Sequence, residues 1–420
     1  AGRAPSCGCL ARPGTGPERW GLVPSRIDRP SSAREAAAAL ADCARAGEAV
    51  WVVGAGTRLA ALPPVPHRTV VLETARLSGI VALEAADLTL TVRGGTKIEA
   101  VHEALEEKGI ELPGAHFGLA EGTIGGAIAT DLADARRGAF GPLRDRILGM
   151  EIAGADGRVS RSGGRVVKNV TGYDVGRLLA GSCGSLGVIT EVTLRLMPRP
   201  ETHAPFERGY VDPVAAAEEG LRVAREAPAL GFVALVTSGR QTRLAWVHEG
   251  DREWVEAGVA WSVSVFGAAR ETDSADHPAA VGSRLLLRAL EHVCPDRTNL
   301  LVRGSVRPAR IPQVIGRFRE LGLDQYGAHL SQGALFARGS AGDERLVGAI
   351  EAIESAAGTW RVQGAWRPTD GPGRTPWGGI DTPWDLYARL KKTFDPALVL
   401  GPPVFGSGAP GAGRPEGARA

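Results

Sequence analysis

The stretch AVWVVGAGT, residues 49–57, runs from an apolar strand directly into a glycine cluster. Glycine has no Cβ and adopts positive φ freely, so successive N–H groups can point into one concavity that accepts a diphosphate. Two further clusters follow in the same apolar part of the chain, GTIGG at 122–126 and GSLG at 184–187. Three clusters ordered between predicted strands indicate a backbone surface for phosphate and a flat ring.

Helices and strands are predicted around these clusters from caps, alternation and turn signals. Ser31 and Ser32 precede an alanine-rich helix over 33–46, and Gly47 ends it. The other predicted helices cover 97–108, 175–180 and 386–394, and the predicted strands cover 49–53, 69–73, 79–84, 88–92 and 188–196. A hairpin is predicted from 147–153 and 159–162 around Asp156-Gly157. We therefore predict that the first half of the chain contains both helices and strands.

Chain length predicts more than one folding unit, because 420 residues exceed what one core usually accommodates. Pro198-Arg199-Pro200 breaks the pattern, and no glycine cluster follows it, so we expect a domain boundary there. The expected segments are a disordered tail at 1–20, a first domain at 21–199, a second at 205–375, a segment returning to the first domain at 376–406, and a disordered tail at 407–420.

Composition narrows the possible partners and compartments. The net charge is +2 and no basic stripe interleaves with aromatic residues, so we expect no nucleic-acid partner. The five cysteines show no Cys-x-x-Cys spacing, which predicts neither an iron–sulfur cluster nor a zinc site in this chain. No apolar run is long enough to cross a bilayer. We expect a reducing, cytoplasmic location with membrane association only through partners.

Lysine is scarce in this chain, because almost all of the basic residues are arginine. The few lysines are Lys97, Lys108, Lys168, Lys391 and Lys392. Lysine presents a compact ammonium where arginine presents a planar fork, so these positions are candidates for contacts that arginine cannot make.

A dinucleotide-binding βαβ unit is the nearest competing interpretation of residues 50–73. Glu73 stands about twenty residues after the first glycine cluster, where a ribose-binding acid is expected. Against it, Leu59 occupies the third glycine position, and ALPPVP at 61–66 cannot form a crossover helix because proline lacks an amide donor and clashes with the preceding turn. We therefore expect a helix-free cradle in which the loop itself binds phosphate.

Several motifs together resemble one flavoprotein family. They are VVGAGTRL (52–59), TVRGGTKIEAVHEAL (91–105), EGTIGGAIAT (121–130), GAFGPLRDRILGMEIAGADGRV (138–159) and GGRVVKNVTGYDVGRLLAGSCGSLGVITEVTLRLMP (163–198). Their order and spacing resemble the FAD-binding domain of vanillyl-alcohol-oxidase-like, PCMH-type FAD-linked oxidases. RVVKNVTGYDV at 165–175 is most similar to the FAD-binding E subunits of bacterial glycolate oxidases. LKKTFDPALVLGPPVFG (390–406) resembles the family's closing segment, although Gly401 stands where asparagine is usual.

The resemblance implies an α+β fold, with a PCMH-type FAD-binding domain of two α+β subdomains and a C-terminal α+β cap domain. It also implies three groups of FAD-binding residues: Gly54, Ala55, Gly56, Thr57 and Arg58 at the diphosphate; Thr123, Gly125, Gly126 and Thr130 along the diphosphate and the isoalloxazine; and Gly184, Ser185, Gly187 and Ile189 at the adenosine half or the ring edge. Neutral backbone donors suit a diphosphate, and a glycine floor lets a planar ring approach closely.

Two departures from relatives bear on chemistry. Some relatives attach the flavin covalently to a histidine of the first loop, where this chain has Thr57, so we expect non-covalent FAD. Relatives that oxidise 2-hydroxy acids alone carry a metal-binding histidine pair in their second half. Here His329 is solitary, and we expect it to be a core or interface residue and expect no metal site.

The resemblance implies the FAD-binding subunit of a glycolate oxidase complex, which oxidises glycolate or another 2-hydroxy acid. Electrons would pass through flavin to an iron–sulfur subunit, beside a related FAD-containing D subunit. Three alternatives stay open: a self-sufficient FAD-dependent dehydrogenase of another hydroxylated substrate, a flavin-carrying assembly subunit without catalysis, and a relative of the peptidoglycan precursor reductase. The last requires a catalytic serine and glutamate that the sequence does not locate.

Overall fold

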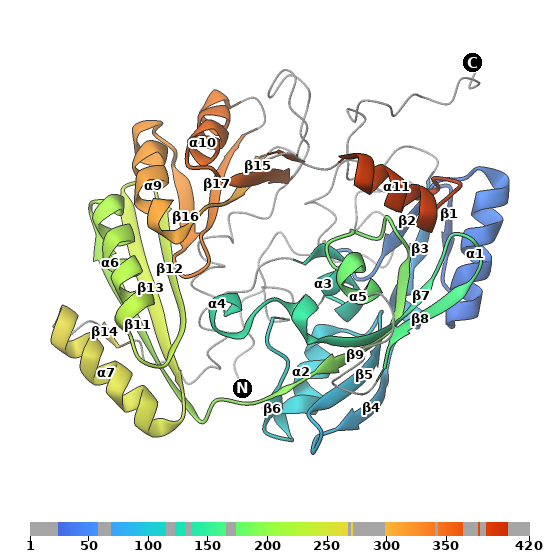
Figure 1. Ribbon diagram of the computed structural model, residues 1–420, viewed down its shortest axis with the longest axis horizontal. Coiled ribbons are helices and arrows are strands. Elements are labelled where there is room, and N and C mark those ends of the chain that lie inside the picture. Colours follow the sequence, from blue (N-terminus) through green and yellow to red (C-terminus); the bar gives the residue numbers. More distant parts are fainter. Residues whose placement is uncertain are drawn as a thin grey trace.

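The computed structural model describes residues 24–57, 69–114, 122–131, 136–164, 174–267, 270–271, 299–340, 343–363, 377–378 and 384–401. Two smaller sheets built mostly from the first half lie on one side of the molecule, and a nine-stranded sheet from the second half lies on the other (Figure 1). The fold is α+β. None of the helices in these ranges is long and apolar enough to cross a membrane.

The first sheet is four-stranded and entirely parallel, in the order β1-β3-β2-β20. Its strands are β1 (Arg26–Asp28), β2 (Val50–Val53), β3 (Val70–Glu73) and β20 (Leu400–Gly401). Helix α1 (Ala33–Ala46) begins where the Ser32 side chain accepts the Glu35 N–H, and it ends at Gly47 with φ of 65°. Capping and the left-handed glycine therefore act at both ends as the sequence predicts.

The second sheet is antiparallel and five-stranded, in the order β4-β5-β9-β7-β8. Its strands are β4 (Ile80–Glu84), β5 (Thr89–Arg93), β7 (Ile147–Ala153), β8 (Val159–Gly163) and β9 (Val188–Arg195). Helices α2 (Ile98–Glu106), α3 (Ile124–Thr130) and α5 (Val175–Leu179) pack on it through a shared apolar core. The predicted hairpin at 147–162 is the β7–β8 pair. A small ladder joins β6 (Ile110–Glu111) to β10 (Met197–Pro198).

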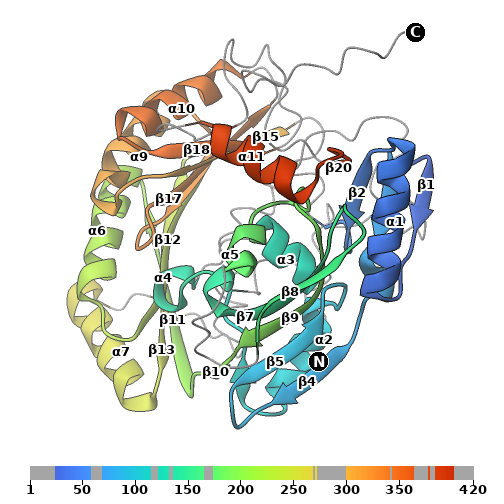
Figure 2. The same ribbon diagram turned by 45° about the vertical axis from the view of Figure 1, so that its right-hand side comes forward.

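The nine-stranded sheet has the order β14-β11-β13-β12-β16-β17-β15-β18-β19. Its strands are β11 (Thr202–Tyr210), β12 (Leu230–Ser238), β13 (Gln241–Gly250), β14 (Arg270–Glu271), β15 (Asn299–Ser305), β16 (Gln325–His329), β17 (Ala334–Ser340), β18 (Thr359–Gln363) and β19 (Trp377–Gly378). Helices α6 (Pro213–Glu226), α7 (Arg252–Phe266), α9 (Ile311–Glu320) and α10 (Glu344–Ser355) line its outer face and share one core with it (Figure 2). The opposite face is turned toward the two smaller sheets and the short helix α4 (Arg137–Phe140).

The structure contains a helix at the second glycine cluster where the sequence predicted none. Helix α3 begins inside this cluster with Thr123 as the N-cap. The Thr123 hydroxyl accepts the Gly126 N–H, and Ala127 and Ala129 are residues that favour a helix. The proline segment 61–66 lies outside the described residues, as do the two predicted tails.

Candidate functional site

A pocket opens where the carboxyl end of β2, the start of α3 and the loop before β9 meet. It is lined by Val52, Val53, Gly54, Ala55, Gly56, Thr57, Thr74, Gly94, Thr123, Gly125, Gly126, Ala129, Thr130, Cys183, Gly184, Gly187 and Ile189. None of these residues carries a charged side chain. A ligand with negative charge would therefore be held here by backbone N–H groups and hydroxyls.

The first cluster follows β2 at the carboxyl edge of the parallel sheet, which is the usual place for ligands in parallel sheets. Gly56 has φ of 77°, a conformation that favours glycine. The backbone N–H groups of Gly54, Ala55 and Gly56 donate to no acceptor within the part of the chain that the structure describes. Buried or half-buried donors of this kind are stabilised by a ligand that accepts hydrogen bonds.

The second cluster is tied to its neighbours by a dense set of hydrogen bonds. Gly125 donates its N–H to the Gly94 carbonyl at 2.7 Å, and the Thr130 hydroxyl donates to the Gly126 carbonyl at 2.8 Å. A Cβ on Gly54 would lie 2.2 Å from Thr123 Oγ1, so the first and second clusters touch. Only glycine allows this approach, because real Cβ atoms do not come so close to other heavy atoms.

The third cluster approaches the same pocket from the loop before β9. Cys183 has φ of 54° and Gly184 has φ of 80°, so two consecutive residues have left-handed backbone conformations. The Cys183 N–H donates to the Ala129 carbonyl at 2.7 Å, which joins this loop to the end of α3. A non-glycine residue in this conformation is strained by about 1–2 kcal/mol. The surrounding contacts must therefore hold the loop in place.

The structure brings together most of the residues predicted to bind a ligand. Gly54, Ala55, Gly56, Thr57, Thr123, Gly125, Gly126, Thr130, Gly184, Gly187 and Ile189 all line the pocket. Arg58 lies outside the described residues. Ser185 is fully buried beside the pocket rather than among its lining residues; its hydroxyl donates to the Ser182 carbonyl at 2.7 Å.

Sequence reasoning missed several lining residues, including Thr74, Gly94, Ala129 and Cys183. The Gly94-Gly95 pair near the end of a predicted strand could have indicated that Gly94 lines the pocket. A Cβ on Gly94 would lie 2.1 Å from the Ile189 carbonyl oxygen, so this glycine is required by close packing of two strands. Cys183 also contributes to the pocket wall.

His329 on β16 is buried, with 4% of its surface exposed. Burial chiefly lowers its pKa, to about 3, and Arg303 adds to the effect. Its Nδ1 has no hydrogen-bond partner among the residues that the structure describes. A histidine with such a pKa is neutral at physiological pH and is a weak base, so it is poorly suited to proton abstraction. Among the described residues no group of three His, Cys, Asp or Glu side chains is arranged to hold a metal ion.

Comparisons with known proteins give matches to a family model, to curated proteins and to solved structures. Residues 24–163 match the family model of the FAD binding domain. Glycolate oxidase subunit GlcE of Escherichia coli (strain K12) is 42% identical over 132 residues, which cover 31% of this chain and 37% of that protein. Glycolate oxidase subunit GlcD of Bacillus subtilis (strain 168) is 31% identical over 196 residues, which cover 47% of this chain and 42% of that protein.

A third relative, D-2-hydroxyglutarate dehydrogenase of Xanthomonas citri pv. viticola, is 34% identical over 182 residues, which cover 43% of this chain and 39% of that protein. The matched segments thus span less than half of the length of each of these curated relatives. A solved structure of alkyldihydroxyacetonephosphate synthase superposes with a TM-score of 0.63 at 15% identity, over 89% of this chain and 75% of that one. This likeness shows a shared fold.

Together the family match and the relatives support the FAD-linked oxidase superfamily of oxidoreductases. The match at 24–163 contains the first and second glycine clusters and ends before the third. The pocket therefore combines clusters inside the matched segment with a third one that the fold brings to it.

Proposed function

We propose that this chain is the FAD-binding subunit of a glycolate oxidase complex. The observation that carries the proposal is the neutral pocket lined by three glycine clusters, with N–H groups of Gly54, Ala55 and Gly56 left without acceptors among the described residues. The family match over residues 24–163 and the resemblance to glycolate oxidase subunits support the same assignment. A diphosphate accepts hydrogen bonds from such a cradle without meeting side chains.

The three clusters would have separate roles toward the dinucleotide. Residues 54–58 would hold the diphosphate. Thr123, Gly125, Gly126 and Thr130 would continue along the diphosphate and the isoalloxazine. Gly184, Gly187 and Ile189 would contact the adenosine half or the ring edge, while Ser185 would act from behind the pocket wall. We propose non-covalent binding, because Thr57 has no side chain suited to attachment of the flavin ring.

Oxidation of glycolate to glyoxylate releases two electrons and two protons, and FAD supplies a two-electron acceptor when bound. The cysteine spacing of this chain offers no iron–sulfur ligands. We propose that electrons leave through an iron–sulfur subunit, that a related D subunit assembles with this chain, and that the complex is cytoplasmic and reaches a membrane only through partners. The glycolate oxidase names of two relatives support this assignment.

We also propose a division of the chain that follows its sheets. Residues 21–199 would form the FAD-binding domain, 205–375 the cap, and 376–406 a segment that returns to the first domain. The change from the five-stranded to the nine-stranded sheet between β10 and β11 supports the boundary, and the parallel pairing of β20 with β2 supports the return.

A second candidate is a self-sufficient FAD-dependent dehydrogenase for another 2-hydroxy acid. The similarity to a D-2-hydroxyglutarate dehydrogenase and to a D-lactate dehydrogenase of Archaeoglobus fulgidus favours it. The two candidates differ in what the isolated chain does. A self-sufficient enzyme reduces its flavin when substrate is added, whereas the subunit needs its partners to do so.

The decisive experiment is to purify the chain, titrate it with FAD and record its visible spectrum before and after anaerobic addition of glycolate, D-lactate or D-2-hydroxyglutarate. We expect stoichiometric FAD, and bleaching by glycolate only when the partner subunits are present. Bleaching of the isolated chain by one of the other acids would favour the second candidate. A folded chain that takes up no FAD would refute both.

The site assignment has its own test, a double substitution in α3. Changing Gly125 and Gly126 to valine fills the pocket floor, and a Cβ on Gly125 would lie 2.8 Å from the Gly94 carbonyl oxygen. We expect loss of the yellow colour. Gly164→Val is a matched control, because a Cβ there has no atom within 4 Å. Stoichiometric FAD in the folded double variant would contradict the assignment.

A further inference from the structure

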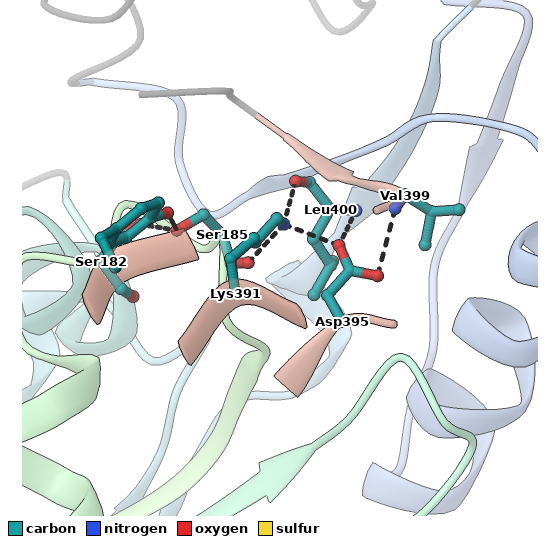
Figure 3. Close-up of polar contacts among 7 residues, drawn as sticks. Ser182, Ser185, Lys391, Asp395, Val399 and Leu400 are labelled. Carbon is teal, nitrogen blue, oxygen red and sulfur yellow. Dashed lines mark hydrogen bonds and ion pairs between the residues drawn. The ribbon is translucent and has the colours of Figure 1, made fainter. Parts of the chain in front are cut away.

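Lys391 on the C-terminal helix α11 (Trp384–Phe394) makes an unusual set of contacts. Its ammonium donates to the Ser185 carbonyl at 2.7 Å, to the Leu400 carbonyl at 2.7 Å and to Asp395 Oδ2 at 2.6 Å (Figure 3). The Lys391 side chain is only 13% exposed. Three donors thus meet three acceptors, and each N–H of the buried ammonium is satisfied.

Asp395 organises the other end of this contact set. Its side chain is fully buried. Besides Lys391, it accepts the Leu400 N–H on Oδ2 at 2.7 Å and the Val399 N–H on Oδ1 at 3.1 Å (Figure 3). The carboxylate therefore shapes the turn between α11 and β20 and at the same time compensates the charge of the ammonium, which a buried ion requires.

A second bond from α11 reaches the same loop. The Ser185 hydroxyl donates to the Ser182 carbonyl at 2.7 Å, so it accepts from the Tyr387 hydroxyl at 3.1 Å. Burial raises the pKa of Tyr387 to about 12, so the phenol keeps its proton. Helix α11 consequently holds Ser185 by both its carbonyl and its hydroxyl.

These contacts connect two walls of the pocket. Ser185 directly follows Gly184, which lines the pocket in a left-handed conformation. Leu400 pairs with Val50 on β2, the strand that leads into the first glycine cluster. Lys391 therefore bridges the loop that carries the third cluster and the sheet that carries the first, although it does not itself line the pocket.

We propose that Lys391 is a positioning residue for the FAD site: from a segment about two hundred residues away, its ammonium fixes the spacing between the first and third glycine clusters. This inference rests on the proposed function, because it assigns the fixed spacing to FAD. Lysine suits the task since its compact ammonium directs three donors to converging acceptors, which the planar fork of arginine does not. Lys391 is thus one of the few lysines in an arginine-rich chain with a role that arginine cannot take over.

The test compares FAD affinity among variants of the full chain, measured by titration of the apoprotein and following flavin fluorescence and the shape of the visible bands. Lys391→Met removes the ammonium at nearly constant length. Lys392→Met is the matched control, because Lys392 is the next residue of the same helix and is exposed. Hydrogen bonds to charged groups contribute enough that we expect Lys391→Met to bind FAD about 10- to 100-fold more weakly. Lys392→Met should bind as the parent does.

Tyr387→Phe is the milder variant, because it removes one neutral hydrogen bond to the loop and keeps the ring. We expect FAD affinity about 2- to 10-fold lower. If Lys391→Met does not fold, the FAD affinity of Tyr387→Phe tests the proposal in its place. Folded variants that melt earlier yet bind FAD with the parent's affinity and spectrum would overturn the proposal, since that is the result of a purely structural contact. If the unmodified chain itself takes up no FAD, the proposed function fails first.

Discussion

Two buried cations connect distant parts of this molecule, and they do so in different ways. Arg136, fully buried, donates from Nε to Glu249 on β13 at 2.8 Å and makes two bonds to Glu111 on β6, at 2.8 and 3.0 Å. Lys391 meets a single carboxylate and two backbone carbonyls. The Arg136 junction thus pairs charge with charge across the two halves, whereas the Lys391 ammonium also bonds two backbone carbonyls, one in a pocket loop and one on β20.

We expect the two junctions to contribute differently, the Arg136 junction to the stability of the fold and the Lys391 junction to the geometry of the pocket. Burial alone lowers the pKa of Arg136, but Glu249 and Glu111 together outweigh it and raise the pKa above its ordinary value. The cation is therefore needed to compensate two buried carboxylates, neither of which lines the pocket. We expect the Arg136 junction to govern how firmly the nine-stranded sheet is attached, and the Lys391 junction to govern how the pocket is shaped.

The largest expected effect is that of Arg136→Met. It leaves two carboxylates buried without their cation, and breaking a buried pair in this way typically costs about 3–5 kcal/mol. Urea unfolding should show this loss, while FAD affinity of the folded fraction changes less than in Lys391→Met. Arg137→Met is the control, because the Arg137 guanidinium lies 3.8 Å from Asp131 and is partly exposed, so a loss of about 1 kcal/mol or less is expected. A small stability loss with a large loss of FAD affinity would reverse the comparison.

The next effect in size is that of Gly184→Ala. With φ of 80° a Cβ is strained by about 1–2 kcal/mol, and it would lie 3.3 Å from Val52 Cβ at the pocket wall. We expect lower stability and weaker FAD binding together. Gly47→Ala carries the same backbone strain at the end of α1, with no atom within 4 Å of the added Cβ. It should lose stability alone. If both variants bind FAD equally well, the third cluster has no part in the site.

The smallest effect at neutral pH is that of His329, and it grows as the pH falls. The pKa of His329 in the folded chain, about 3, lies below the ordinary value of 6.5. Between these two pH values the unfolded chain therefore binds a proton at this histidine and the folded chain does not. The stability contributed by neutral His329 is complete above pH 6.5 and falls as the pH decreases toward 3, by up to about 1.4 kcal/mol per unit. Urea unfolding of the parent and of His329→Leu between pH 5 and 8 should show a flatter profile for the variant.

Protonation of His329 is expected to affect the Arg136 junction before the Lys391 junction. The β16–β17 turn that follows His329 packs against α4, where a Cβ on Gly138 would lie 2.4 Å from Ser331 Oγ. Arg136 precedes the same helix. Mild acid should therefore weaken the attachment of the nine-stranded sheet before it alters the Lys391 junction. Parallel slopes for parent and variant would mean that His329 titrates normally and that its burial is not maintained in solution.

Local elements followed from local chemistry. The helix over 33–46 has the predicted bounds because serine and glycine act at its two ends through short-range bonds. The short helix at the second glycine cluster escaped prediction, because a threonine cap within a glycine-rich segment gives a weaker signal than the glycines themselves. Ser185 was expected among the ligand-binding residues from its place in the third cluster, but its direction depends on Tyr387, which no local pattern reveals.

The sequence by itself determined where the chain bends into glycine-rich loops, because φ preferences, caps and alternation act over a few residues. It also marked Lys391 as one of the rare lysines, without indicating its partners. Only the tertiary structure brought the three clusters around one pocket and placed Lys391 against a carbonyl 206 positions earlier in the chain. Such contacts depend on how whole sheets pack, and the packing is decided by burial summed over the entire core rather than by any single segment.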